Sequence, residues 1–532
     1  MEGKIETRVI DGKAVSAEVR AEVKALTEQL KQEHAVVPGL AMILVGERPD
    51  SKSYVANKTK AAKEVDFHVV DVHLAETVTQ EELLAELKKL NDDPKVHGIL
   101  VQLPLPEHIN EGTVLKHIRV DKDADCFAAE NVGNLCLKGG DPPLAVPCTP
   151  AGCVELLQRS RVDVCGKSVV ILGRSNLVGM PMAQLLLSMD ATVTICHSKS
   201  QDVAQHLRGA DIVVAAIGQA QFVRGEWLKP GCVVIDVGIN SVDDATKKSG
   251  YRLVGDVNSP EVLGVASLVT PVPGGVGPMT IAMLLKNVLN LARQSAGLPR
   301  VPLRREAGGW REAQGGSEFL RLSLGSKKCK PEADSSSPFA FGTLARAMAG
   351  RSFPVLAACA SGVAIGLGLR RLLVRENQAE QPQKEETNVK KVETKNIDGK
   401  AIAAQVRAEV KEYAAQLKAE CGVTPGLAVV LVGSRKDSQS YVRNKKKAAD
   451  EVGFHTVDVT LPETVTQEDL LLEVQKLNDD PKVHAILVQL PLPSHIDEAL
   501  ILSKIRVDKD ADGFSAENVG NLCLRGGAPP LA

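Results

Sequence analysis

Tyr54 and Lys58 lie four residues apart and could together carry proton-transfer chemistry. The surrounding residues predict a helix over 51–64, and a spacing of four places both side chains on one helical face. An aromatic ring beside a lysine in a cleft excludes water, which favours the neutral amine and makes it a usable proton donor or acceptor. Because surface helices often carry such pairs, the chemistry of this pair depends on the residues that accompany it.

Gln102 and Asp125 are polar residues that could complete this site. Gln102 ends a predicted strand over 97–102, and α/β proteins bind ligands at the carboxyl ends of parallel strands. Asp125 closes the polar turn 121–125 and could present a carboxylate to a ligand that is rich in hydrogen-bond donors. On local sequence alone, a cap or turn former is the favoured interpretation of Asp125.

A glycine-rich turn over residues 173–181 follows a predicted strand at 168–172 and leads into a predicted helix. Backbone N–H groups at such a helix start can hold a phosphate, although the spacing here is not GxGxxG. The next strand, 192–196, ends without the Asp or Glu that binds the ribose diol of NAD. Arg174 and Ser198 instead suit a 2′-phosphate, so the sequence predicts NADP as the cofactor.

A second motif rich in Gly and Pro occupies residues 270–280. Its composition provides rigid turns and close backbone approach, which a simple loop would not require. We therefore interpret this motif as a wall that contacts a ligand.

The front part of the chain occurs twice, at a constant offset of 387 residues with no gap. Residues 10–13 recur at 397–400, and residues 101–106 recur at 488–493. The second copy ends at Ala532, before any counterpart of the glycine-rich turn. The chain is thus expected to hold one whole enzyme and the front half of another. The second-copy equivalents of the four candidate residues are Tyr441, Lys445, Gln489 and Asp512.

The composition is that of a large intracellular protein with several domains. Its 532 residues are 44% apolar, which is enough for well-filled cores. The net charge of -2 gives no reason to expect nucleic acid or an anionic membrane as a partner. Eleven cysteines without CxxC pairs or His clusters favour reduced thiols over disulfides or a metal site. Residues 1–6 resemble no targeting signal, so the expected location is the cytoplasm.

Helical and strand patterns alternate, so we predict an α/β fold with mostly parallel sheets. The expected helices are 13–33, 51–64, 79–91, 150–159, 180–188, 201–208 and 279–294. The expected strands are 39–45, 69–74, 97–102, 168–172, 192–196, 211–217 and 232–237.

Residues 297–391 differ from the rest of the chain and are expected to form a disordered linker. Within them, 353–369 is an uncharged run that is only marginally long for a membrane span. The wider segment 335–375 has two interpretations. It is either a transit peptide or signal anchor inside the chain, or an irregular linker with an apolar patch. A membrane is expected as a partner only if 353–369 inserts.

Residues 5–295 resemble the bifunctional methylenetetrahydrofolate dehydrogenase/methenyltetrahydrofolate cyclohydrolase family. The resemblance rests on five segments in the family's order and spacing: the Tyr54/Lys58 helix and residues 101–106, 147–150, 173–181 and 273–278. Residues 392–532 resemble only the folate-binding lobe of that family. The implied domains are a catalytic lobe over 1–148, a Rossmann-like NADP lobe over 149–277, a returning helix over 278–296, the linker, and a truncated catalytic lobe over 392–532.

The resemblance implies that a one-carbon derivative of tetrahydrofolate sits between two lobes. Methylenetetrahydrofolate is oxidised with NADP, and the methenyl product is hydrolysed to 10-formyltetrahydrofolate. Lys58 is the implied catalytic lysine, Tyr54 packs on the folate, and Gln102 hydrogen-bonds to Lys58. Asp125 anchors the pterin. The other implied residues are Pro273, Gly274 and Gly275 for the substrate and Gly173, Arg174, Ser175, Ser198, Ile239 and Thr280 for the cofactor. A homodimer is also expected.

Two residues of the first copy depart from the family pattern. Asp66 replaces a glycine that the second copy keeps as Gly453, and Cys126 replaces one that it keeps as Gly513. If the position of Cys126 needs a positive φ, the Cβ of Cys126 strains its turn by ~1–3 kcal/mol. The strain at Cys126 would displace the neighbouring Asp125.

Other interpretations stay open at this point. A short-chain dehydrogenase also uses Tyr-x-x-x-Lys, but there the pair follows the glycine-rich turn, whereas here it precedes that turn. A non-catalytic folate- or NADP-binding duplicate is the alternative from another class. The repeat also fits two neighbouring genes joined into one chain, with a separate mitochondrial or plastid product that starts near 335–375.

Overall fold

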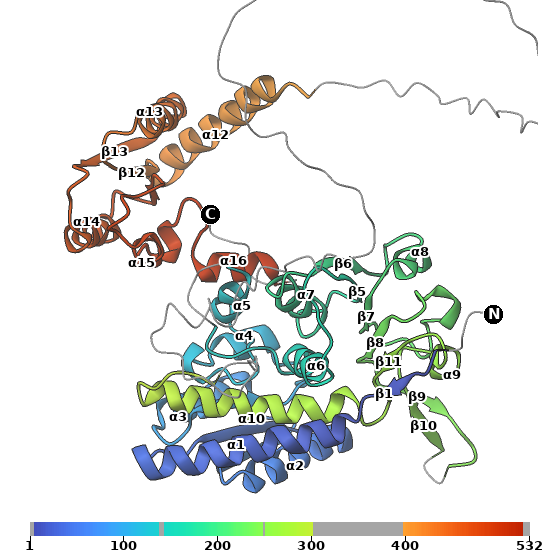
Figure 1. The fold of residues 1–532 in the computed structure, drawn as a ribbon. Helices are drawn as coiled ribbons and strands as arrows, with labels where there is room; N and C mark the ends of the chain where they lie inside the picture. Colours follow the sequence, from blue (N-terminus) through green and yellow to red (C-terminus); the bar gives the residue numbers. More distant parts are fainter. Residues whose placement is uncertain (1–4, 138–142, 248–249, 302–396, 525–532) are drawn as a thin grey trace, which may run out of the picture. The chain divides into compact units, whose positions relative to one another are not determined.

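The computed structural model describes residues 5–137, 143–247, 250–301 and 397–524 (Figure 1). These residues contain the predicted α/β segments of both copies, each with its own parallel sheet. The segment 353–369 and nearly all of the proposed linker lie outside the described residues. Among the helices that are described, none is both long and apolar enough to cross a membrane.

The first catalytic lobe has a three-stranded parallel sheet in the order β3-β2-β4. The central strand β2 is buried along its whole length, as its continuous apolar sequence requires. Helix α1 begins where the Asp11 carboxylate accepts the backbone N–H groups of Lys13 and Ala14. The elements are α1 (Gly12–His34), β2 (Gly39–Val45), α2 (Pro49–Glu64), β3 (His68–Leu74), α3 (Gln80–Asp92), β4 (Gly98–Val101), α4 (Glu111–Lys116), η1 (Val120–Lys122) and α5 (Ala129–Cys136).

The second lobe is built on a six-stranded sheet in the order β1-β11-β8-β7-β5-β6, in which all pairs are parallel. A separate antiparallel pair, β9 and β10, was not predicted. The elements are α6 (Cys148–Arg159), β5 (Ser168–Leu172), α7 (Gly179–Leu187), β6 (Thr192–Cys196), α8 (Val203–Arg208), β7 (Ile212–Ala215), η2 (Gly225–Trp227), β8 (Val233–Asp236), β9 (Asn240–Asp243), β10 (Tyr251–Val254), α9 (Ser259–Val262) and β11 (Leu268–Val269).

The two lobes exchange elements at their ends. The expectation that residues 1–148 form a lobe of their own is wrong at its start. Strand β1 (Arg8–Val9) pairs with β11 and so extends the sheet of the second lobe. Such a two-residue strand carries no periodicity, which is why the sequence did not reveal it. In the other direction, α10 (Val276–Ser295) returns to pack along α1 and α6 (Figure 1).

The second copy repeats the order and register of the first, with the parallel sheet β13-β12-β14. Its helix α12 corresponds to α1 but exposes an apolar face that α1 buries. Val19 and Leu30 of α1 are 1% exposed, whereas their counterparts Val406 and Leu417 are 50% and 39% exposed. The elements are α12 (Gly399–Cys421), β12 (Gly426–Val432), α13 (Lys436–Glu451), β13 (His455–Leu461), α14 (Gln467–Asp479), β14 (Ala485–Val488), α15 (Glu498–Ser503), η3 (Val507–Lys509) and α16 (Ala516–Cys523).

Eight cysteines of the described residues carry free thiols.

Candidate active site

Lys58 and Gln102 meet at the carboxyl edge of the first catalytic sheet. The Nζ of Lys58, on α2, donates to the Oε1 of Gln102 over 3.1 Å. Gln102 follows β4 directly, and its Nε2 donates to the carbonyl of Leu103 over 2.8 Å, which fixes the orientation of the amide. Tyr54 lies one turn before Lys58 and is 50% exposed, so its ring is available to a ligand. The structure therefore brings together the three residues that the sequence placed at this site.

Asp125 joins them on a turn that is held against the end of β4. Residue 123 forms a β-bridge with Ile99 of that strand, and the Asp123 carboxylate accepts the N–H of Ala128 over 2.8 Å. Burial raises the pKa of Asp125, while the nearby charge of Lys58 and a hydrogen bond from Cys148 lower it. A carboxyl group in such a place can bind donors on a ligand, which a turn former in solvent could not do.

Asn287 of α10 holds this turn by hydrogen bonds, and no local pattern in the sequence indicated its role. Its Nδ2 donates to the carbonyl of Ala124 over 2.8 Å and to that of Val146 over 2.7 Å. The helix that returns from the far end of the domain thus fixes the residue before Asp125. Both bonds join residues about 140 or more positions apart, so no local pattern could have found them.

Cys126 has φ +63°, as inferred for a position that the second copy fills with glycine, and Asp66 also has a positive φ, +62°. The glycines at the matching positions of the second copy, Gly453 and Gly513, have φ values of +84° and +67°. Cys126 is buried directly beside Asp125, whereas Asp66 is exposed.

We predict that Cys126→Gly tightens folate binding by about fivefold, because it removes ~1 kcal/mol of strain next to Asp125. Titration of the folate substrate against the variant measures the Kd. Asp66→Gly relieves similar strain away from the site and is the control, with an expected Kd equal to that of the parent chain. An unchanged or weaker Kd for Cys126→Gly would show that the turn tolerates the Cβ.

The glycine-rich turn of the second lobe is shaped for close backbone approach. Gly173 has φ +111°, and a Cβ on it would overlap the carbonyl oxygen of Ala216. A Cβ on Gly179, where α7 starts, would overlap the carbonyl oxygen of Gly173. The Ser175 Oγ accepts the N–H of Val178 over 3.1 Å and holds the turn in place. Only glycine fits at these two positions, and the start of α7 is thereby left open to a phosphate.

Arg174 and Ser198 lie at the carboxyl ends of the neighbouring strands β5 and β6. Ser198 is exposed and Arg174 is partly exposed, so both can reach a ligand above the sheet. The strands pair in parallel, with Leu172 opposite Cys196. This adjacency agrees with the prediction that both serve one cofactor.

The motif at 270–280 lies against the start of α1. A Cβ on Gly12 would overlap the carbonyl oxygen of Gly275, so the first turn of α1 rests directly on the motif. The bond before Pro273 is cis, and Gly274 has φ +107°. At the end of the motif, the Thr280 and Thr149 hydroxyls lie 3.0 Å apart. The motif therefore joins the first catalytic lobe to the second lobe.

Ile239 is 48% exposed and follows β8 at the carboxyl edge of the six-stranded sheet. A Cβ on Gly277 would lie 3.9 Å from its Cδ1, so the side chain sits beside the motif at 270–280. This position suits a contact with a ligand on that edge.

The equivalent residues of the second copy do not form the same site. Tyr441 is 63% exposed. Among the described residues, the buried Oε1 of Gln489 has no hydrogen-bond partner, although its counterpart in Gln102 accepts from Lys58. No corresponding bond joins Lys445 to Gln489 in the described part of the chain. The turn at Asp512 has a counterpart of Asp123 in Asp510, which accepts the N–H of Ser515 over 2.7 Å.

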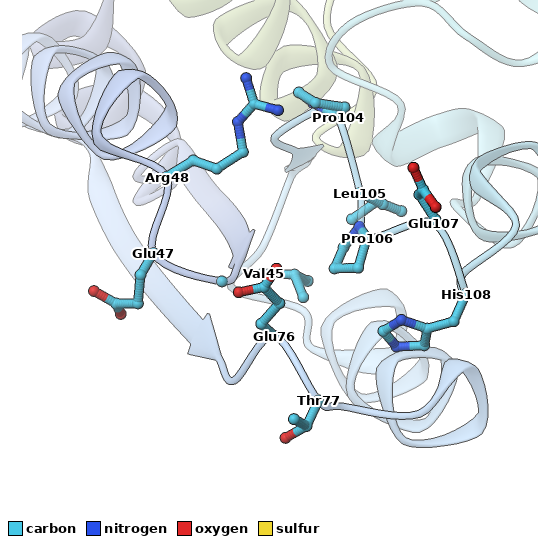
Figure 2. A pocket seen from close by; sticks show the side chains of 11 residues that line it. Val45, Glu47, Arg48, Glu76, Thr77, Pro104, Leu105, Pro106, Glu107 and His108 are labelled. Atoms are coloured by element: carbon cyan, nitrogen blue, oxygen red, sulfur yellow. The ribbon is translucent and has the colours of Figure 1, made fainter.

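A cavity of about 730 Å³ opens at the same sheet edge of the first catalytic lobe (Figure 2). Arg48 and Pro104 lie at one end of it and Thr77 at the other. Neither Lys58 nor the other three candidate residues line it. Because a hydrogen bond joins Lys58 to Gln102 and charge couples Lys58 to Asp125, we place the site at these residues, with Tyr54 one turn before Lys58, rather than in this cavity.

Comparison with known proteins identifies the two kinds of domain. The model of the tetrahydrofolate dehydrogenase/cyclohydrolase catalytic domain matches residues 10–125 and again 397–512. The model of the NAD(P)-binding domain of the same family matches residues 147–296.

The similar proteins agree with this result. Bifunctional protein FolD 2 of Arabidopsis thaliana is 52% identical over 290 residues, which cover 54% of this chain and 97% of that protein. The chloroplastic FolD 4 of the same plant is 52% identical over 54% of this chain and 79% of its own length. The structure of FolD from Trypanosoma brucei, complexed with NADP cofactor and inhibitor, is 46% identical with a TM-score of 0.53, over 55% of this chain and 98% of that one.

The catalytic domain and the NAD(P)-binding domain of the family both occur in this chain, and the motif at 270–280 rests on the start of α1. The chain belongs to the tetrahydrofolate dehydrogenase/cyclohydrolase family and carries a second, partial catalytic region.

Proposed function

We propose that the first copy oxidises 5,10-methylenetetrahydrofolate to the methenyl form with NADP and hydrolyses that product to 10-formyltetrahydrofolate. The Lys58–Gln102 hydrogen bond beside the half-buried Asp125 is the observation that carries this proposal. It supports roles for Lys58 as the proton-transferring amine and for Asp125 as the carboxyl that binds the pterin. The second copy lacks both the Lys–Gln bond and a cofactor lobe after it among the described residues.

The residues of this chain divide the work between binding and proton transfer. NADP, when bound, accepts the hydride that leaves the one-carbon bridge. Asp125 binds donors of the pterin, and Tyr54 covers the folate beside the reacting carbon. Lys58, oriented by Gln102, orients the water that attacks the methenyl cation and exchanges a proton with it. Pro273, Gly274 and Gly275 form the wall between substrate and cofactor.

The cofactor residues divide in the same way. Gly173 and Ser175 hold the pyrophosphate at the start of α7. Ile239 and Thr280 contact the nicotinamide end. Arg174 and Ser198 bind the 2′-phosphate that distinguishes NADP from NAD.

We predict that Arg174→Ala lowers kcat/KM with NADP by about 10–100-fold, the usual effect of losing one hydrogen bond to a charged group. The kcat/KM with NAD should stay within about twofold, because NAD has no group for Arg174 to bind. Rates of NADPH and NADH formation at 340 nm measure both. If the parent chain has a higher kcat/KM with NAD than with NADP, the cofactor assignment is wrong.

A homodimer is the assembly that we propose. Helices α5 and α16 have the same sequence and pack on each other, with the Sγ atoms of Cys136 and Cys523 3.4 Å apart. Gly133 and Gly520 approach the carbonyls of Ala516 and Ala129 so closely that a Cβ on either would overlap them. A helix that packs on its own repeat is self-complementary, which supports pairing of the same face between chains.

A further inference from the structure

Two buried carboxylates, Asp236 and Asp256, lie at the carboxyl edge of the six-stranded sheet and have no part in the scheme above. Asp236 ends β8 and is 1% exposed, and Asp256 follows β10 and is 0% exposed. Within the described residues, neither forms an ion pair. A buried carboxylate without a cation is costly unless hydrogen bonds replace those that it made to water. Each of these two carboxylates therefore needs hydrogen-bond donors around it.

Asp236 accepts three backbone N–H groups from two separate segments. Its Oδ1 accepts from Gly238 over 3.1 Å and from Asp256 over 2.9 Å. Its Oδ2 accepts from Val257 over 3.0 Å. Burial raises the pKa of Asp236 to about 7, against the lowering effect of these hydrogen bonds. The side chain thus ties the loop after β8 to the segment after β10.

Asp256 extends the same connection to a third segment. Its Oδ2 accepts the N–H groups of Ile217 over 2.7 Å and Gly218 over 3.0 Å, both in the loop after β7. Its Oδ1 accepts from the Nδ2 of Asn240 over 2.9 Å. The two carboxylates therefore hold the loops after β7 and β8 at fixed positions from each other.

These loops lie where the far half of a dinucleotide must run. In a doubly wound sheet the pyrophosphate sits at the first glycine-rich turn and one ribose at the end of the next strand, here β5 and β6. The other half then extends across β7 and β8, on the opposite side of β5 from β6. Ile239, between Gly238 and Asn240, is exposed on this path, and both of its neighbours bond to the carboxylate pair.

We propose that Asp236 and Asp256 are positioning residues that hold the loops binding the nicotinamide half of the cofactor, an inference that rests on the proposed NADP site. They touch neither reacting carbon nor hydride. Their effect is to fix Ile239 and the Gly218 loop before the cofactor arrives, so that binding does not have to order them.

The geometry predicts different results for two isosteric substitutions. All three hydrogen-bond partners of Asp236 are backbone N–H groups, which can only donate. In Asp236→Asn, the new side-chain N–H₂ must therefore face one of these N–H groups, and that N–H loses its acceptor. In Asp256→Asn, the oxygen can keep Ile217 and Gly218, and the new N–H₂ can face Asn240, whose amide can turn to present its oxygen. Asp256→Asn is therefore the conservative variant, which can keep the hydrogen bonds by which Asp256 holds the loops.

The test uses the full chain and both of its activities. Asp236→Asn should raise the KM for NADP and the Kd from NADP titration by about tenfold or more, and Asp256→Asn by about twofold or less. Hydrolysis of methenyltetrahydrofolate needs no hydride acceptor, so its rate should stay within about twofold in both variants.

Three outcomes decide the inference. A tenfold rise in KM for NADP with unchanged hydrolysis supports a positioning role. An unchanged KM in Asp236→Asn overturns it, and so does a parallel fall in both activities, since that would be general loss of structure. If the parent chain fails to reduce NADP, the proposed function itself fails, which the parent assay shows before any variant is made.

Discussion

Lys58→Met is expected to lower the rate of methenyltetrahydrofolate hydrolysis by ~10²–10⁴-fold, the usual contribution of one general acid–base group. Methionine keeps the length of the side chain but removes the ammonium that donates to Gln102. Lys58 is half-buried on α2, so the substitution leaves no cavity in the core. The loss should therefore appear in kcat rather than in the melting temperature.

Lys445→Met is the matched control, because Lys445 occupies the same position in the second copy without a bond to Gln489. The rate of methenyltetrahydrofolate hydrolysis in this variant should stay within about twofold of the rate of the parent chain, because no proton-transfer group of the active site is lost. Hydrolysis is followed by the loss of methenyl absorbance in both variants. Near-parental turnover in Lys58→Met would refute the role of Lys58, and a loss in Lys445→Met would show that the second copy is catalytic.

Residues 392–532 expressed alone are expected to reduce no NADP and to lack a cooperative thermal transition. Their helix α12 exposes the face that α1 buries against α10, including Val406 and Leu417. Burial of each such side chain is worth about 1.5–3 kcal/mol, and a whole domain is stable by only about 5–15 kcal/mol. A few uncovered side chains are therefore enough to unfold it or to drive association.

The second copy also carries a Cβ where a helix placed like α10 would need close contact. A Cβ on Gly98 would lie 2.7 Å from the Cγ2 of Val288 on α10 and 3.2 Å from the Cβ of Ala124. The second copy carries Ala485 at the matching position. A synthetic peptide of residues 276–295 should therefore fail to restore a cooperative melt to the fragment. Circular dichroism with and without the peptide tests this, and a sharp melt accompanied by NADP reduction would overturn the half-enzyme interpretation.

Local chemistry explains which parts of the fold could be predicted from the sequence. The buried strands β2 and β5 are continuous apolar runs, and the α1 helix has apolar residues at helical spacing, so their ranges agree with the prediction to within one residue or two. The Tyr54–Lys58 face and the glycine-rich turn also depend on neighbouring residues only. The positive φ of Cys126 was inferred by comparing the two copies, because the second copy keeps a glycine, Gly513, at the matching position.

Long-range contacts explain what the sequence did not reveal. Strand β1 is defined only by its pairing with β11, and Asn287 reaches the Asp125 turn from a helix that is remote in sequence. Asp236 and Asp256 form a unit only because β8 and the segment after β10 are adjacent in the fold. None of these residues has a local pattern that separates it from an ordinary polar residue on a loop.

The structure and its relatives assign two sequential reactions with NADP to the site in the first copy. The most direct measurement incubates the full chain with methylenetetrahydrofolate and NADP and quantifies NADPH and 10-formyltetrahydrofolate in the same sample. We predict one 10-formyl product for each NADPH, with one NADP bound per chain at saturation. Three results would each rule out this assignment. They are the absence of NADPH, methenyltetrahydrofolate that disappears no faster than it hydrolyses without enzyme, and the binding of two NADP molecules per chain.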